Sequence, residues 1–186
     1  MKKLITFLVF TLLIISSAYS QNWQEVTVSG ITLRWATTSA TELSVELSAA
    51  TTGWVSVGFD PVMGMQGANI IIGYYASGSA EIRDDFGVAP TGHDADTNLG
   101  GTSDLTVDGG SESSGVTEIQ FTIPLDSGDQ YDKALVPGNS YLVMLAHGSN
   151  GADNFTSPHA TRDTTTIEIQ TMALDPETWG TVKTGF

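Results

Sequence analysis

The feature that most constrains the fold is a series of short runs in which apolar and polar residues alternate. Residues 31–35, 43–47 and 116–123 each place apolar side chains at every second position. Because successive side chains of a β-strand point to opposite faces, this period predicts strands with one buried face. Clusters of Gly, Ser, Asp and Asn separate the runs, and helical periodicity is hard to find beyond the first 20 residues. The pattern therefore predicts an all-β domain.

Residues 70–75 differ from the other runs, because they form a near-continuous apolar stretch that suits a strand buried on both faces. Further β-rich runs lie at 54–59, 81–84, 103–108, 141–146 and 164–170. Together the runs predict about nine or ten strands, which suits an antiparallel β-sandwich of immunoglobulin-like architecture. No linker divides them, so we expect one domain over residues 21–170 and a short tail at 171–186.

The first 20 residues do not share this pattern. Two lysines precede an almost wholly apolar stretch at residues 4–15, and small polar residues follow as far as Ser20. This is the pattern of a secretory signal peptide, with an expected cut after Ser20. The apolar stretch is shorter than the ~20 residues of a membrane span, so we expect no stable span after cleavage, and an uncleaved anchor is the alternative. The predicted location is secreted or periplasmic.

Charge and cysteine content exclude several classes of function. The formal charge is −14, and removal of residues 1–20 takes away two lysines and no acidic residue, which leaves −16. Such a surface repels nucleic-acid phosphates and anionic lipid headgroups, so no nucleic-acid partner is expected. The chain has no cysteine. Thiol catalysis, zinc–thiolate sites, iron–sulfur clusters and covalent c-type haem attachment are therefore excluded.

Motifs of autonomous enzymes are missing from the sequence. There is no Gly-x-Ser-x-Gly elbow for a serine nucleophile and no His-Glu-x-x-His zinc motif. Asp94 and Asp96 carry carboxylate oxygens that suit calcium, but the full spacing of a calcium loop is absent. The sequence favours a solvated loop for these two residues, and we expect a module that is not an autonomous catalyst.

Methionine and histidine residues are the remaining candidates for chemistry. Met63 and Met65 lie in a glycine-punctuated bend at residues 62–68, between two apolar runs. A methionine in a bend is often core filler, yet a bend between strands also places side chains at the rim of a sandwich. His159 lies in a loop before the last predicted strand, where a surface histidine is the simpler interpretation. The residues alone leave both alternatives open.

The order of several short segments resembles the DOMON domain family over roughly residues 23–170. The segments are Gly-Trp-Val-Ser-Val-Gly-Phe at 53–59, Met-Gln-Gly-Ala-Asn at 65–69, Ile-Ile-Ile-Gly-Tyr at 70–74, Asp84, Gly-Val-Thr-Glu-Ile-Gln-Phe at 115–121, Gly-Asp-Gln-Tyr-Asp at 128–132, Leu-Ala-His-Gly at 145–148 and Ser-Pro-His at 157–159. DOMON domains are β-sandwiches that generally lie outside the cytoplasm. Some members bind b-type haem between a methionine and a histidine, others are thought to bind sugars, and others are accessory modules of redox enzymes.

The resemblance implies a ligand pair. The position of the haem-binding methionine is taken here by Met65 and that of the histidine by His159, and Met63 is the alternative if the bend differs by two residues. Residue 69 is Asn where the family often has Asp, which puts in doubt a carboxylate role there but not the haem ligands. His147 stands where the family often has an aromatic residue, so a pocket or core position is expected.

Other residues are expected around the implied haem b. Val57, Phe59, Ile71 and Tyr74 are candidates to line its pocket, although the sequence does not determine which face of the sheet they occupy. Arg162 follows His159 by three residues and is a candidate partner for a haem propionate, with a surface ion pair as the alternative. A thioether and an imidazole hold iron with six ligands and leave no open position for a substrate, which suits electron transfer.

The leading hypothesis is therefore an extracytoplasmic module that binds haem b and transfers electrons to a redox partner protein. Its acidic surface would steer docking onto a basic partner. The alternative is a module that binds carbohydrate or another small ligand, in which Trp35, Trp54, Tyr74 or Tyr75 stack against sugar rings. A purely structural interaction domain is a third possibility.

Overall fold

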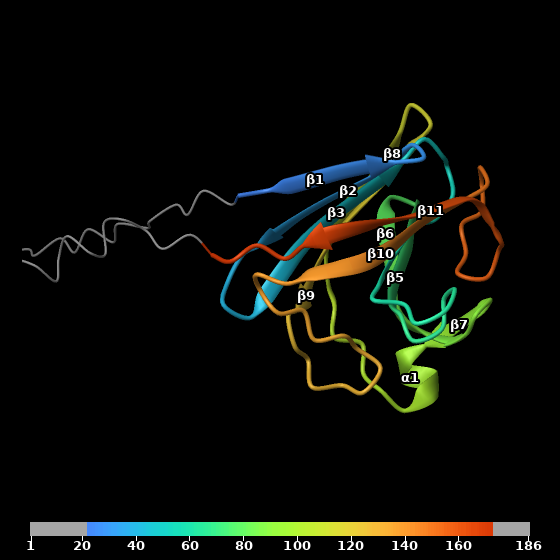
Figure 1. Ribbon diagram of the computed structural model, residues 1–186. Coiled ribbons are helices and arrows are strands. Elements are labelled where there is room, and N and C mark those ends of the chain that lie inside the picture. The colour runs from blue at the N-terminus through green and yellow to red at the C-terminus, as the bar shows by residue number, and fades with distance from the viewer. Residues whose placement is uncertain (1–21, 173–186) are drawn as a thin grey trace, which may run out of the picture.

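A computed structural model describes residues 22–172 as two antiparallel β-sheets packed face to face (Figure 1). The five-stranded sheet has the order β1-β2-β3-β9-β8, and the six-stranded sheet has the order β11-β10-β4-β5-β6-β7. The first sheet consists of β1 (Gln24–Val28), β2 (Ile31–Thr37), β3 (Glu42–Ala49), β9 (Val116–Pro124) and β8 (Thr106–Ser113). The second consists of β11 (His159–Glu168), β10 (Ser140–Gly148), β4 (Val55–Phe59), β5 (Asn69–Ala76), β6 (Ser79–Ala89) and β7 (Gly92–Ala95), and the short helix α1 (Asp96–Leu99) follows it.

Apolar residues at alternate strand positions fill the space between the sheets. In β3 the side chains of Leu43, Val45 and Leu47 are at most 1 % exposed, while the residues between them are half-buried. Phe121 of β9 and Phe59 of β4 reach the same core from the two sheets, and both are fully buried. Each such side chain contributes roughly 1.5–3 kcal/mol through removal of its apolar surface from water.

The sequence prediction of an antiparallel all-β sandwich is confirmed, although residues 22–172 contain eleven strands rather than nine or ten. The two strands that the sequence pattern does not indicate are β1 and β7. β1 is a half-buried edge strand, and β7 has the sequence Gly-His-Asp-Ala, without apolar alternation. The last strand also begins earlier than expected, because β11 starts at His159.

Both faces of the six-stranded sheet are buried at its centre. Every residue of β4 is buried, and so are Ile70, Ile71 and Ile72 in β5, as the continuous apolar run predicts. The inner face packs against the other sheet, while loops after β4 and β10 and the β6–β7 turn lie over the outer face. This second buried face is where the candidate site lies.

The predicted signal peptide at residues 1–20 lies outside the described residues, as does the tail from residue 173 onward, so these remain predictions. Over residues 22–172, no helix is long and apolar enough to cross a membrane.

Candidate functional site

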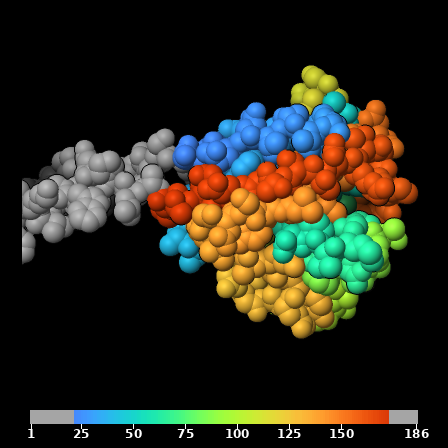
Figure 2. Space-filling view, viewed as in Figure 1, coloured from blue at the N-terminus to red at the C-terminus, as the bar shows by residue number. Residues whose placement is uncertain are grey.

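A cavity of about 840 Å³ lies on the outer face of the six-stranded sheet. Its floor is formed by the outward-facing side chains of three neighbouring strands. These are Ser56 and Gly58 of β4, Ile70 and Ile72 of β5, and Met144 and Ala146 of β10. The walls come from the loop after β4, the β6–β7 turn, the loop before β11 and the first residues of β11. Figure 2 shows the face on which β11 and the loop after β4 both come to the surface.

Glycine at position 58 keeps the floor of the cavity low. Gly58 is paired with Met144 on one side and Ile70 on the other. A Cβ atom at this position would lie 2.9 Å from Met144 Cε and 3.3 Å from Ile70 Cγ1, so a larger residue would push the Met144 side chain upward. The apolar floor suits a flat, largely apolar ligand, since cofactor sites are concave and mostly apolar.

The loop between β4 and β5 carries the two candidate methionines, and both line the cavity. The backbone N–H of Met65 donates to the carbonyl of Pro90 at 3.0 Å, and its own carbonyl accepts from Ala68 N–H at 3.1 Å. A Cβ at Gly87 would lie 1.6 Å from the Met65 carbonyl oxygen, so only glycine allows this close approach. Met65 is therefore held in a fixed position and is partly buried.

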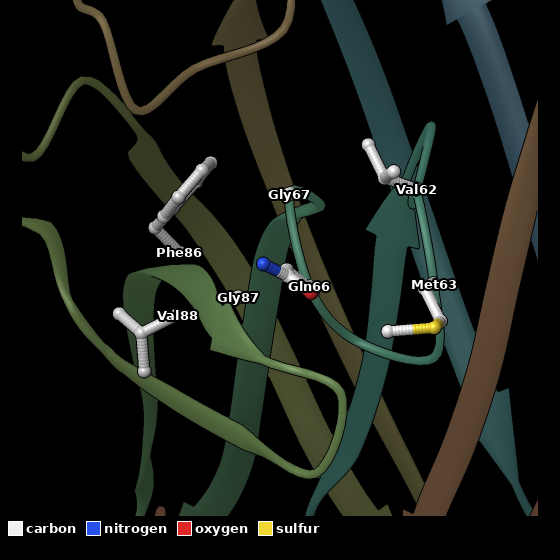
Figure 3. A pocket seen from close by; sticks show the side chains of 7 residues that line it. All are labelled: Val62, Met63, Gln66, Gly67, Phe86, Gly87 and Val88. Atoms are coloured by element: carbon white, nitrogen blue, oxygen red, sulfur yellow. The ribbon is translucent and has the colours of Figure 1, made fainter.

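Met63 is placed differently, because it lies at the crest of the same loop and its side chain is 59 % exposed. It also borders a shallower neighbouring pocket of about 510 Å³, whose lining includes Val62, Phe86 and Val88 (Figure 3). Met63 thus lines both the shallow pocket and the larger cavity, whereas Met65 lines the larger cavity and not the shallow pocket.

The candidate histidine and arginine lie at the other end of the floor. His159 is the first residue of β11 and is paired with Gly148, next to the start of β4, whereas the methionine loop follows the end of β4. Arg162 Nη1 lies 3.2 Å from His159 Nε2. A guanidinium can only donate, so Nε2 is the ring nitrogen that carries the lone pair. Both side chains are exposed and line the cavity.

A second histidine, His93 of β7, also lines the cavity, and the sequence gives no reason to single it out. Its Nδ1 lies 2.5 Å from a carboxylate oxygen of Asp85, which is fully buried. Arg83 donates to the same carboxylate from Nε at 2.5 Å and Nη2 at 2.7 Å. The buried carboxylate thus fixes the orientation of the His93 ring.

Tyr74 does not line the cavity. Its ring packs against the ring of Phe155, with centroids 5.1 Å apart. The guanidinium carbon of Arg83 lies 4.5 Å from the centroid of the same Phe155 ring. Tyr74 therefore braces the loop that leads to His159 rather than contacting the cavity directly. His147 also lies outside the cavity lining, and its Nδ1 is 2.8 Å from the Gly148 carbonyl.

The expected lining by Val57, Phe59 and Ile71 is wrong. These residues point inward and belong to the core between the sheets. In strands buried on both faces, the apolar pattern does not distinguish inside from outside, so the residues next to them form the floor instead. Trp54, which the sequence analysis considered only for sugar stacking, and Met144, which it did not identify, also line the cavity. The sequence could have indicated Met144 only through its position in the strand, because it lies between the core residues Val143 and Leu145 and therefore points to the outer face.

The fold is a β-sandwich with a cavity on the outer face of one sheet. The family model of the DOMON domain matches residues 27–148, more than half of the chain, and the protein belongs to this family.

Other comparisons give one relative by sequence and two solved structures with a similar fold. The chain is 27 % identical over 143 residues to the DBH-like monooxygenase protein 1 of Mus musculus, a match that covers 76 % of this chain and 22 % of that relative. The cytochrome b domain of pyranose dehydrogenase from Coprinopsis cinerea has a TM-score of 0.55 at 14 % identity, covering 74 % of this chain and 76 % of that one. The cytochrome domain of Myriococcum thermophilum cellobiose dehydrogenase has a TM-score of 0.59 at 12 % identity, covering 89 % and 90 %. At these identities the solved structures share the fold.

Proposed function

We propose that this protein is an exported module that binds haem b between Met65 and His159 and transfers electrons. The observation that supports this proposal is that Met65 and His159, almost 100 positions apart in the sequence, line the same cavity. The cytochrome domains that share the fold add to its support.

The residues present fit a haem group in three respects. The donor set is a soft thioether and an imidazole whose Nε2 faces Arg162 at 3.2 Å. The two donors approach from opposite ends of an apolar floor. The cavity volume of about 840 Å³ lies within the range of roughly 300–1,000 Å³ found for cofactor sites. Haem would supply one-electron redox chemistry at this position.

Met65 is a better candidate ligand than Met63, because its backbone is fixed by Pro90 and Gly87 and its side chain is partly buried. His93 is a weaker candidate than His159. It lies on the same wall as Met65, since Met65 N–H is bonded to Pro90 three residues before His93. A second ligand of the same iron would have to lie across the cavity from Met65, where His159 lies.

The other side chains of the site position the ligand rather than react. Arg162 would be placed to pair with a propionate of the bound group. Ile70, Ile72 and Met144 would keep water from the edge of the ring that faces the floor. If Met65 and His159 both held the iron, no position would remain for a substrate, so we propose an electron-transfer module rather than an enzyme.

The proposed setting is outside the cytoplasm, with a basic redox partner protein that docks on the acidic surface. The carbohydrate-binding alternative has less support from the site. Trp35 is 6 % exposed in the core and donates from its indole N–H to the Glu168 carbonyl, and Trp54 is 4 % exposed. Neither offers an open face for a sugar ring.

The test is the absorption spectrum of residues 21–186 expressed with haem available, in the oxidised and reduced states. We expect a low-spin b-type spectrum that Met65→Ala and His159→Ala abolish. Matched controls are Met63→Ala and His147→Ala, which remove the same side chains and leave the spectrum intact. A protein that stays colourless after reconstitution with haem refutes the proposal and favours the carbohydrate alternative. Loss of the spectrum in His93→Ala but not in His159→Ala would instead assign the histidine ligand to His93.

A further inference from the structure

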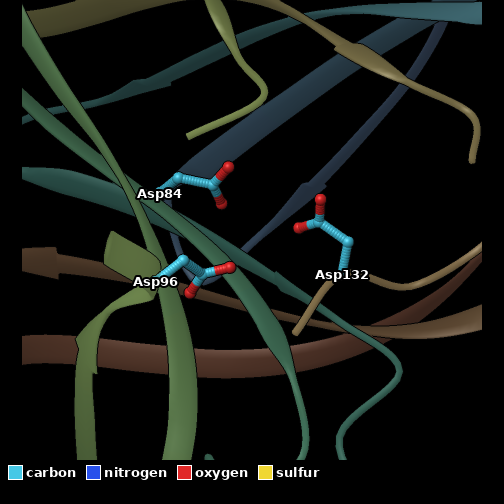
Figure 4. Close-up of side chains that lie close together, drawn as sticks. All are labelled: Asp84, Asp96 and Asp132. Atoms are coloured by element: carbon cyan, nitrogen blue, oxygen red, sulfur yellow. The ribbon is translucent and has the colours of Figure 1, made fainter. Parts of the chain in front are cut away.

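Three aspartates converge on the side of the molecule that carries α1, away from the cavity lining. Asp84 lies in β6, Asp96 is the first residue of α1, and Asp132 lies in the loop between β9 and β10 (Figure 4). One carboxylate oxygen from each lies within 4.8 Å of the others. Asp84 and Asp96 are 3 % and 0 % exposed. The interpretation of Asp96 as part of a solvated loop is therefore wrong.

Several buried oxygen atoms in and beside this cluster have no hydrogen-bond partner among the described residues. Asn69, the first residue of β5, is 5 % exposed, and its Nδ2 donates to Asp132 Oδ1 at 2.8 Å. Its Oδ1 receives no hydrogen bond within residues 22–172. The same holds for Asp84 Oδ1 and for both oxygens of Asp96. Buried acceptors are normally satisfied, so the three unpaired aspartate oxygens of this cluster indicate a missing electropositive partner.

No basic side chain of the described part of the chain fills this role. Arg83 and His93 pair with Asp85, the next residue along β6, and Lys133 pairs with Asp60 at 3.4 Å rather than with its neighbour Asp132. Asp104 is nearby, and its backbone N–H donates to Asp84 Oδ2 at 3.1 Å. Among residues 22–172, the donors to the cluster are thus backbone and neutral groups.

Protonation is the alternative way to neutralise the cluster. Burial, with repulsion from Asp132, raises the pKa of Asp84 to about 8, and the same two causes raise the pKa of Asp96 to about 7. A proton on Asp84 would still leave both oxygens of Asp96 without a hydrogen-bond partner. A cation with several oxygen ligands would satisfy the unpaired aspartate oxygens at once.

We propose that Asp84, Asp96 and Asp132 bind a calcium ion, beside Asn69, whose amide N–H holds the Asp132 carboxylate. All candidate ligands are oxygens, without the histidine or cysteine that zinc and copper prefer. Calcium accepts irregular shells of six to eight oxygens, whereas Mg²⁺ demands near-ideal octahedral geometry. The ion would tie α1 and the β9–β10 loop to the six-stranded sheet. The proposal is independent of the proposed haem site, because none of these four residues lines that cavity.

The test uses residues 21–186 without haem, stripped of metal with EDTA and titrated with CaCl₂ at constant ionic strength. We expect binding of one ion by calorimetry and a rise in the Tm, with a dissociation constant no weaker than about 10⁻³ M, the range of extracellular calcium modules. MgCl₂ should bind at least about tenfold more weakly. Asp96→Asn should lower calcium affinity by at least about tenfold.

The matched control is Asp94→Asn, two residues away, where the carboxylate is solvated and bonded to Asn98. It should keep the calcium affinity of the wild type. If Asp96→Asn does not fold, Asn69→Ala replaces it, because this variant removes the amide that holds the Asp132 carboxylate without changing charge. No rise in Tm at 10 mM CaCl₂, or equal losses in Asp94→Asn and Asp96→Asn, would overturn the proposal by showing that calcium only screens the acidic surface.

Discussion

In EDTA, replacement of Asp84 by Asn should stabilise the protein at pH 8 and have almost no effect at pH 4. Below about pH 4 the carboxyl group is protonated in both the folded and the unfolded chain. As the pH rises from about 4 to about 8, the unfolded chain releases this proton while the folded chain retains it, so the free energy of unfolding falls. The loss is complete above about pH 8, where the folded chain also ionises.

The magnitude follows from the pKa of Asp84, which burial raises from 3.8 to about 8. One pKa unit corresponds to about 1.4 kcal/mol, so the full shift sets a ceiling of roughly 6 kcal/mol. Local rearrangement and entry of water offset much of this cost, and we expect a gain of about 2 kcal/mol in Asp84→Asn. For a domain of this size that is a rise in Tm of about 4–8 °C. The Asn side chain can still accept the hydrogen bond from Asp104 N–H.

The assay is urea unfolding of wild type and Asp84→Asn, followed by tryptophan fluorescence at pH 4, 6 and 8 in EDTA. The two stability curves should meet near pH 4 and separate steadily toward pH 8. Addition of calcium at pH 8 should reverse the order, because only the wild type keeps the full ligand set. A variant that is less stable than the wild type at pH 8 in EDTA would refute the reasoning, as would a difference that does not change with pH.

Two further predictions concern the site and the core. Gly87→Ala should displace the Met65 loop, because the added Cβ would overlap the Met65 carbonyl. We expect haem uptake to fall at least about tenfold and the free energy of unfolding to fall by about 1–3 kcal/mol. In the control Gly92→Ala, the added Cβ has no neighbour closer than 3.9 Å, so the haem spectrum should stay unchanged. Phe121→Ala should cost about 3–5 kcal/mol in urea unfolding, since this side chain is fully buried, whereas Val107→Ala, at a position 46 % exposed, should change stability by less than about 0.5 kcal/mol. Equal haem uptake by Gly87→Ala and Gly92→Ala would contradict the first expectation. Equal stability of Phe121→Ala and Val107→Ala would contradict the second.

The sequence predicted the strands well where one face is polar. In β3 and β9 the apolar positions of the alternating pattern are the buried ones, because a half-buried strand shows its two faces directly in its residue types. Prediction of the cavity lining failed in β4 and β5 for the opposite reason. Ile70, Ile71 and Ile72 are all buried, so nothing in their residue types separates the floor of the cavity from the core.

The sequence by itself determined the two-faced strands, the all-β class and, through a family resemblance, the candidate residues Met65 and His159. Only the tertiary structure brought these residues to one cavity, because the pairing of β4, β5, β10 and β11 decides which loops meet over the outer face. The acidic cluster also depends on tertiary contacts alone. Its aspartates come from a strand, a short helix and a loop, and burial is what turns ordinary surface residue types into a site with an unmet charge.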